Sequence, residues 1–252
     1  MDSLSSAIIK EKLKYDFEVS VLKEIDSTST YLLSVADENT RNGTAVFSEM
    51  QTNGRGRRGK SFFSPDKTGL YFSFLLRPEK DFTPAEITLT AAVSVTLALE
   101  KLLGVTPKIK WVNDIFLDGK KVCGILAERH QREKEVFYIL GVGVNVYRPE
   151  NDFPHEIKET AGYILPSERE NFKSYLASEI INEFFYLHKS DFSVILKEYS
   201  SRLLGVGKEI KVLCNCPYSA VLRGINKNGE LIVTKENGEE ALLSSGEISI
   251  VL

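Results

Sequence analysis

Short runs in which apolar and polar residues alternate are spread along most of this chain, and longer amphipathic stretches separate them. The alternating runs predict β-strands at residues 17–25, 44–51, 69–76, 109–117, 122–128 and 137–146. Stretches whose apolar residues recur at helical spacing predict helices at residues 3–14, 31–36, 83–104, 167–188 and 191–204. The third of these helices carries a capping-box pattern at Thr83 and Glu86 and ends at Gly104. Because it is small or apolar on nearly every face, we expect it to be buried against the sheet.

The pattern changes after Gly205-Val206-Gly207, where only short strands follow. They are predicted at residues 209–214, 220–225, 230–234, 241–243 and 247–251. Turn sequences separate them at residues 226–229 and 236–238. We therefore expect a main domain over residues 1–204 and a small SH3-like β-barrel over residues 205–252.

Composition narrows the class of protein. The chain has 252 residues, of which 42% are hydrophobic and 27% charged, so it can bury a sizeable core. Its formal net charge of −3 argues against general nucleic-acid binding, which needs a basic face. No apolar run approaches the ~20 residues that cross a membrane. The cysteines (Cys123, Cys214 and Cys216) form no CxxC motif and no signal peptide is present, which together indicate free thiols in a reducing cytosol.

The most unusual stretch is Gly54-Arg55-Gly56-Arg57-Arg58-Gly59-Lys60, which we call the basic loop. Its four cations repel one another, so a compact loop needs an anion nearby; the alternative is a solvated, mobile loop. Residues 54–61 also fit the P-loop pattern, and the glycines fit G-x-G-x-x-G. Both patterns require a helix after the glycines, whereas Ser64-Pro65-Asp66 and an aromatic strand follow here. We therefore do not expect a P-loop NTPase, which would release ADP.

Polar residues interrupt the predicted strands and turns at several other places, and together they suggest a common site. They are Ser27, Thr28, Ser29, Gln51, Arg55, Arg57, Lys110, Asn113, Asp114, Lys121 and Asn145. Cations dominate this set, it contains no cysteine–histidine pair, and the three histidines lie too far apart in sequence to suggest a metal site. Such a set suits chemistry between anions, for example attack of a carboxylate, already ionised at neutral pH, on the α-phosphate of a nucleotide.

The order and spacing of these motifs resemble those of biotin protein ligases. The resemblance runs from about residue 17 to the C-terminus. It rests on Asp26-Ser27-Thr28-Ser29-Thr30, Gln51 with the basic loop, Lys110-Trp111-Val112-Asn113-Asp114, Lys121 before Gly124-Ile125-Leu126-Ala127-Glu128, and Gly141-Val142-Gly143-Val144-Asn145. It implies an α+β fold with a mixed β-sheet packed by helices, related to class II synthetases, and substrates biotin and ATP with Mg²⁺.

The resemblance also assigns roles to the matching residues. Ser27, Thr28, Ser29 and Gln51 would line the biotin pocket, and Arg55, Gly56 and Arg57 would belong to a loop that closes over the adenylate. Lys121 would bind the biotin carboxyl end and the reacting phosphate, with Lys110 and Asp114 facing the reacting groups. Asn113 would hold adenine, and Asn145 would lie near the nucleotide.

Three residues depart from the family pattern, which usually has asparagine at Ser29, proline at Val112 and tryptophan at Phe62. None of them removes a charge, so we expect them to change affinity more than the reaction. Residues 147–160, which cover adenine in some relatives, contain no tryptophan here.

Simpler interpretations apply to some residues. Trp111 is expected in the core, Asp114 could pair with Lys110, and Arg58 and Lys60 could be solvated charges.

The resemblance names a biotin carboxyl carrier protein of acetyl-CoA carboxylase or a related carboxylase as the partner, in the cytoplasm, and it allows a homodimer. Some relatives bind DNA through an N-terminal domain of about 60 residues. Only 16 residues precede Phe17, so we expect no direct DNA binding. The alternatives are a lipoate or octanoate ligase, whose motifs lack the Arg-Gly-Arg-Arg loop, and an RNA-binding module that uses the basic loop.

Overall fold

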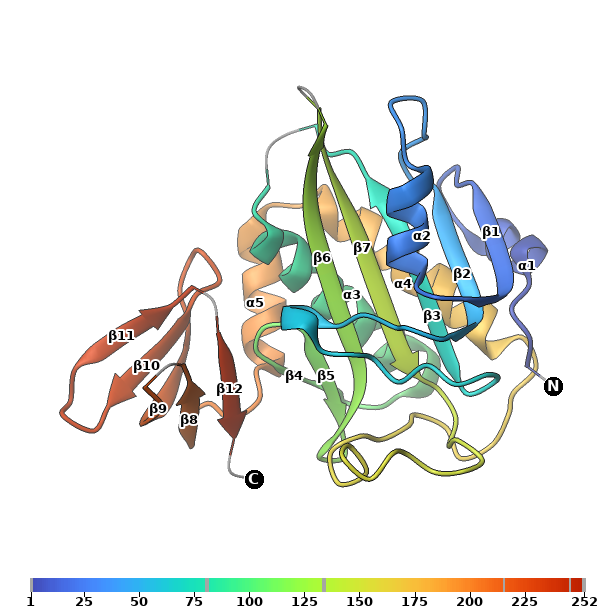
Figure 1. Cartoon of the computed structure of the whole chain (residues 1–252). Helices are drawn as coiled ribbons and strands as arrows, with labels where there is room; N and C mark the ends of the chain where they lie inside the picture. The colour runs from blue at the N-terminus through green and yellow to red at the C-terminus, as the bar shows by residue number, and fades with distance from the viewer. Residues whose placement is uncertain (1, 80–81, 133–134, 215, 245, 251–252) are drawn as a thin grey trace.

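The fold was analysed in a computed structural model of the chain, in which residues 2–79, 82–132, 135–214, 216–244 and 246–250 are described. Its centre is a seven-stranded sheet (Figure 1) in the order β1-β2-β3-β7-β6-β5-β4. The strands are β1 (Val19–Ile25), β2 (Ala45–Gln51), β3 (Gly69–Leu76), β4 (Lys108–Lys110), β5 (Asp114–Leu117), β6 (Lys120–Arg132) and β7 (Glu135–Asn145). Strands β1 and β2 pair in parallel and the other neighbours are antiparallel, so the sheet is mixed, as expected.

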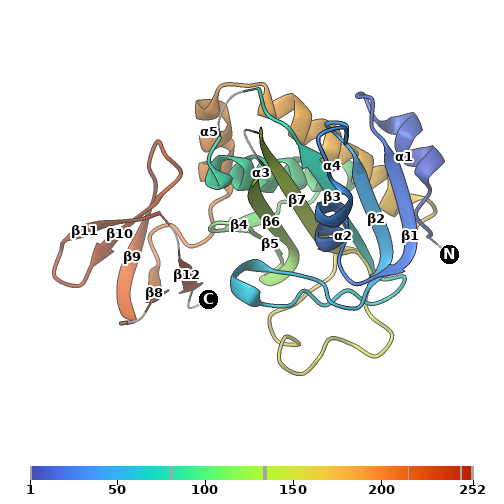
Figure 2. The ribbon, with the colours of Figure 1, turned by 45° about the horizontal axis from the view of Figure 1, so that its top comes forward.

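Helices cover both faces of this sheet. On one face lie α3 (Pro84–Leu103) and α4 (Phe172–His188), with α1 (Ser6–Lys12) packed against α4 and α5 (Phe192–Arg202) packed against α3. On the other face α2 (Thr28–Val35) packs against β2, β3 and β7 (Figure 2). The first turn of α2 and the basic loop therefore lie on the same face of the sheet, where the loop crosses in front of β6 and β7 (Figure 1).

Local signals account for the longest helix. Thr83 and Glu86 make both hydrogen bonds of a capping box at the start of α3, and Gly104 ends the helix in the left-handed conformation with φ 67°. Twelve of the 20 residues of α3 are buried, which confirms its prediction as the core helix.

The prediction of one continuous strand over residues 109–117 is wrong. The chain turns back at Trp111, Val112 and Asn113, so that Lys110 pairs with Asp114 and the segment forms the hairpin β4–β5. The interactions that hold this turn come from distant parts of the chain and are described with the site.

The C-terminal part forms a second, antiparallel sheet of five strands in the order β11-β10-β9-β8-β12. Its strands are β8 (Glu209–Leu213), β9 (Tyr218–Ile225), β10 (Leu231–Lys235), β11 (Glu240–Leu243) and β12 (Glu247–Ile250). Buried residues of this sheet, such as Leu222 and Val233, join the same apolar cluster as the main core. The boundary at residue 204 therefore stays a prediction, although the two sheets are distinct. No helix in the part of the chain that the structure describes is long and apolar enough to cross a membrane.

Candidate active site

A cleft of about 350 Å³ opens on the face of the large sheet that carries α2. It is lined by the start of α2, the end of β2, the basic loop, the β4–β5 turn and the facing parts of β6 and β7. Ten of the twelve predicted site residues line it, namely Ser27, Thr28, Ser29, Gln51, Arg55, Gly56, Lys110, Asn113, Asp114 and Lys121. The structure therefore brings together segments that lie as far as 94 positions apart between Ser27 and Lys121.

One end of the cleft is a network of neutral hydrogen-bonding groups. Thr28 donates its backbone N–H (2.9 Å) and its hydroxyl (3.1 Å) to the amide oxygen of Gln51. The hydroxyl of Ser73 lies 2.8 Å from the hydroxyls of both Thr28 and Ser29. Ser27 instead accepts a hydrogen bond from Thr30 as the N-cap of α2. Because this network fixes the side chains of Thr28, Ser29 and Gln51 before a ligand enters, their remaining donors and acceptors are preorganised.

Ser73 was not predicted from the sequence. It is fully buried in the middle of β3, behind the hydroxyls that line the cleft. A serine within an otherwise apolar strand, Leu70-Tyr71-Phe72-Ser73-Phe74, was the available signal.

Glycines on the two central strands make room for a ring. Gly124 of β6 pairs with Gly143 of β7, and the ring of Phe62 lies against both. A Cβ atom at Gly143 would lie only 2.5 Å from that ring, and one at Gly124 would lie 3.1 Å from it. In this structure the side chain of Phe62, just beyond the basic loop, occupies the space that the two glycines leave.

The other end of the cleft is cationic. Lys121 Nζ lies 2.7 Å from Asp114 Oδ1, and both side chains are largely buried, with 33% and 22% exposed. Asp114 thus forms an ion pair with Lys121. A smaller hollow of about 90 Å³ adjoins this end, and it is lined by Arg57, Arg58, Lys60, Lys110 and Lys121 among others. This concentration of positive charge favours binding of an anion.

The turn between β4 and β5 is held from three sides. The indole N–H of Trp111 donates to the carbonyl of Gly229 in the C-terminal sheet (3.1 Å), so Trp111 is a buried core residue, as expected. The hydroxyl of Tyr199 in α5 donates to the carbonyl of Val112 (3.2 Å). Burial raises the pKa of Tyr199, so it remains a neutral donor. The Asn113 amide N–H donates to the carbonyl of Ile125 (2.9 Å), which leaves its oxygen facing the basic loop.

The basic loop is compact in this structure. Phe62 N–H donates to the Gly54 carbonyl (2.8 Å) and Gly56 N–H donates to the Lys60 carbonyl (2.7 Å), so the loop forms a short hairpin. Arg57 lines the smaller hollow and donates to the Asn113 amide oxygen (3.2 Å). The loop contains a three-residue 3₁₀ turn at Arg57–Gly59, and the next element along the chain is strand β3. A P-loop requires a helix after its glycines, so the prediction that this is not a P-loop is confirmed.

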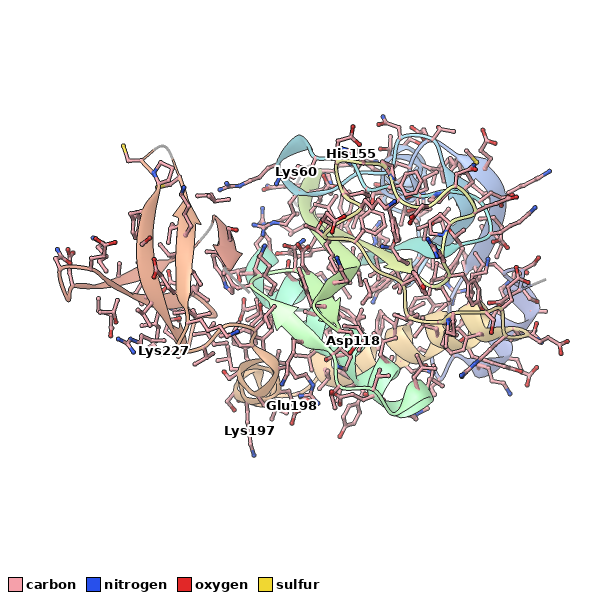
Figure 3. All side chains as sticks on the ribbon, turned by 90° about the horizontal axis from the view of Figure 1, so that it is seen from below. Lys60, Asp118, His155, Lys197, Glu198 and Lys227 are labelled. Atoms are coloured by element: carbon pink, nitrogen blue, oxygen red, sulfur yellow. The ribbon has the colours of Figure 1, made fainter. Side chains whose placement is uncertain are left out.

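Asn145 is placed differently from the other predicted residues. It lies outside the described lining of both hollows, and its amide donates to the carbonyl of Gly162 (3.0 Å). The segment that contains Gly162 also hydrogen-bonds to Lys121, and its Ile157 and Thr160 line the cleft. Figure 3 labels Lys60 of the basic loop and His155 of this segment at the same edge of the molecule. Ile157 and Thr160 carry no sequence signal that would have singled them out.

Among the described residues, no group of three or more His, Cys, Asp or Glu side chains is placed to hold a metal ion. Asp114 is the one carboxylate among the described residues that line the cleft.

Comparison with known proteins identifies the family. Residues 21–145 match the model of the biotin/lipoate A/B protein ligase family. The chain is 32% identical over 230 residues to the bifunctional ligase/repressor BirA of Bacillus subtilis, a match that covers 88% of this chain and 70% of that protein. It is 26% identical over 246 residues to the biotin--[acetyl-CoA-carboxylase] ligase of Mycobacterium tuberculosis, covering 92% of this chain and 88% of that one.

A solved structure gives the same result. The biotin protein ligase from Aquifex aeolicus in complex with biotin and ATP has a TM-score of 0.78 and 30% identity, and the match covers 93% of this chain and 98% of that one. The fold and the comparisons together define an enzyme of the ligase class. The chain belongs to the biotin/lipoate A/B protein ligase family, and the relatives named here are ligases of that family.

Proposed function

We propose that this protein is an ATP-dependent biotin ligase that forms biotinyl-5′-AMP and transfers biotin to a lysine of a biotin carboxyl carrier protein. The observation that carries the proposal is one cleft with a neutral hydrogen-bonding end and a cationic end, covered by the basic loop. Such a cleft suits a ligand with a polar, uncharged ring at one end and a carboxylate at the other. Relatives described as a biotin protein ligase with biotin and ATP, and as a biotin--[acetyl-CoA-carboxylase] ligase, support this choice of ligand.

Biotin would lie with its ureido ring at the neutral end. Ser27, Thr28, Ser29 and Gln51 would contact the ring there, and their hydroxyl and amide groups can both donate and accept hydrogen bonds, as a ureido group requires. The Phe62 ring and the glycine strands would enclose the apolar part of the ligand. The acid chain would then point toward Lys121.

The first step is attack of the biotin carboxylate oxygen on the α-phosphorus of ATP, with cleavage of the bond to pyrophosphate. The carboxylate is ionised at neutral pH, so the step needs no base. Lys121, Lys110 and Arg57 would bring the two anions together and stabilise the charge that develops. The ion pair with Asp114 orients Lys121. Mg²⁺ would enter with the triphosphate, which supplies its oxygen ligands.

In the second step the amine of the acceptor lysine attacks the acyl carbon of the anhydride, and AMP leaves. A free lysine has a pKa of about 10.4 and is mostly protonated at neutral pH, so it must lose a proton before attack. Asp114 is the carboxylate beside the reacting groups and would accept this proton. Enclosure of the anhydride under the basic loop by Arg55, Gly56 and Arg57 would keep water away from it.

The nucleotide would lie across the β4–β5 turn. Asn113 would hydrogen-bond adenine, in competition with Arg57 for the amide oxygen. Asn145 would lie near the nucleotide. Its hydrogen bond to Gly162 would position the segment 147–166, whose Ile157 lines the cleft. The acceptor would be a carrier protein in the cytoplasm, with the carboxylase named for the Mycobacterium tuberculosis relative as the model.

A comparison of neighbouring lysines tests the proposal. We expect Lys121→Ala to lose biotin binding and to slow biotin-dependent exchange of pyrophosphate into ATP by about 100-fold or more, because the charge that joins the two anions is removed. Lys120→Ala is the matched control, since Lys120 is more exposed and its ion-pair partner is Glu159. Normal exchange in Lys121→Ala would contradict the proposal. Exchange driven by lipoate or octanoate but not by biotin would identify the related acyl ligase.

A further inference from the structure

The basic loop carries four cations between Arg55 and Lys60. One of them, Arg55, forms an ion pair with Glu128. The guanidinium of Arg55 donates two hydrogen bonds to the carboxylate of Glu128, at 2.6 Å and 3.0 Å. Glu128 lies in β6, 73 positions away, and only 21% of its side chain is exposed. Two parallel N–H···O bonds between charged groups fix both distance and orientation more strongly than a single contact.

Because the loop is a hairpin, the Arg55–Glu128 pair affects the position of the whole loop. Because backbone hydrogen bonds close the loop from Gly54 to Phe62, its tip is one hydrogen-bonded unit beyond the residues that join it to β2. Those residues are fixed to the end of β1, where Thr52 and Asn53 donate to the carbonyls of Ile25 and Asp26. The loop crosses in front of β6 and β7 (Figure 1). The Arg55–Glu128 pair therefore joins the tip of the loop to β6.

The Arg57–Asn113 and Arg55–Glu128 contacts differ in what a ligand would do to them. Asn113 lines the cleft, so a ligand that enters can compete with Arg57 for its amide oxygen. Glu128 does not line the cleft in the described structure, so its pair with Arg55 can persist when the cleft is occupied. The Arg57–Asn113 contact can be exchanged for a contact with the ligand, whereas the Arg55–Glu128 pair can hold the loop in place before and after the ligand binds.

We propose that Glu128 is a positioning residue, which acts through Arg55 to hold the basic loop closed over the bound adenylate. The inference rests on the proposed function for the identity of the adenylate, but the loop position can be measured without it. Arg55 itself lines the cleft, and its guanidinium is bonded to Glu128.

Limited proteolysis measures the loop position directly, because trypsin cuts after Arg57, Arg58 and Lys60. In the ligand-free protein, Glu128→Gln keeps all of these sites and the shape of the side chain but removes the charge. We expect cleavage within the loop, assigned by mass spectrometry, to become about three- to tenfold faster. Glu198→Gln is the control, because Glu198 forms an ion pair with Arg202 within α5, at the opposite edge of the view in Figure 3 from Lys60. It should cleave in the loop at the wild-type rate.

A charge reversal separates positioning from general destabilisation. The double variant Arg55→Glu with Glu128→Arg should recover slow cleavage at Arg57, whereas each single change alone should be fast. Adenylate formed in place from biotin and ATP should leave Glu128→Gln about three- to tenfold faster than wild type. High salt should bring the wild type toward Glu128→Gln, since it screens a partly exposed pair.

The outcomes separate this inference from the proposed function. Faster loop cleavage in Glu128→Gln that the reversal restores, in a protein that makes no adenylate, would support the anchor and refute biotin ligation. Adenylate formation with loop cleavage and adenylate retention unchanged by Glu128→Gln would refute the anchor alone. Fast cleavage in the reversed pair would also refute it, because the effect would then not depend on the ion pair.

Discussion

The most buried charge in the described part of the chain gives the clearest prediction for stability. Lys173, near the start of α4, has a fully buried side chain whose Nζ lies 2.5 Å from Glu49 Oε2 in β2. The other oxygen of Glu49 accepts a hydrogen bond from the Leu4 backbone (2.6 Å), and Asp2 accepts one from the Lys173 backbone (3.0 Å). This network joins the N-terminal residues, the sheet and α4.

The perturbation is Glu49→Gln, which keeps the shape of the side chain but leaves the Lys173 ammonium buried without its counter-ion. Breaking a buried pair by removing one partner costs about 3–5 kcal/mol. We expect the lower value, about 3 kcal/mol, because 15% of the Glu49 side chain is exposed and Asp2 lies nearby. For a chain of this size, that free energy corresponds to a fall of about 6–12 °C in Tm.

Urea unfolding followed by circular dichroism and by the fluorescence of Trp111, the single tryptophan, measures the free energy of unfolding. The double variant Glu49→Gln with Lys173→Met should return to within about 1 kcal/mol of wild type, because it removes both charges. Glu11→Gln, which breaks the exposed pair with Lys12, should cost less than about 0.5 kcal/mol. The reasoning is refuted if Glu49→Gln costs under 1 kcal/mol, or if the double variant is as unstable as Glu49→Gln alone.

Three further predictions concern the cleft. Arg57→Ala should release biotinyl-5′-AMP about tenfold faster, since a charge over the adenylate is lost; retention at the wild-type rate in a filter assay would contradict this. Asp114→Ala should slow transfer from preformed adenylate to the carrier lysine by about 100-fold, and full-rate transfer would remove Asp114 as the proton acceptor. Gly143→Ala should displace the Phe62 ring and weaken biotin binding, measured by calorimetry, by about tenfold. Gly124→Ala, with more room, should have a smaller effect, and equal affinities in all three proteins would refute the steric argument.

Local interactions explain which parts of the fold were predicted from the sequence. The capping box at Thr83 and the left-handed Gly104 lie next to the helix that they bound, so α3 was predicted almost to the residue. The turn at residues 111–113 could not be predicted in this way. Its apolar neighbours favour a strand, and the groups that stabilise the turn, at Gly229 and Tyr199, are 118 and 87 positions distant. Tertiary contacts outweighed the local pattern there.

The same distinction between local sequence signals and distant contacts applies to the candidate site. The motifs that carry Thr28, Gln51 and Lys121 suggested a common site, and the structure places all three on one cleft. Pairing within the site was not predictable, since the ion pair of Asp114 with Lys121 joins β5 to β6 and depends on how these strands fold together. Which rotamer a lysine adopts depends on the space around it, and that space is set by the fold.

The central claim is that one cleft joins the carboxylate of biotin to AMP. Incubation of the purified protein with α-labelled ATP, with and without biotin and then with a carrier domain, tests it most directly. Label should reach enzyme-bound biotinyl-5′-AMP only when biotin is present, and free AMP should appear stoichiometrically with biotinylated carrier once that domain is added. Label that stays in ATP regardless of biotin, or that appears as ADP, would contradict it.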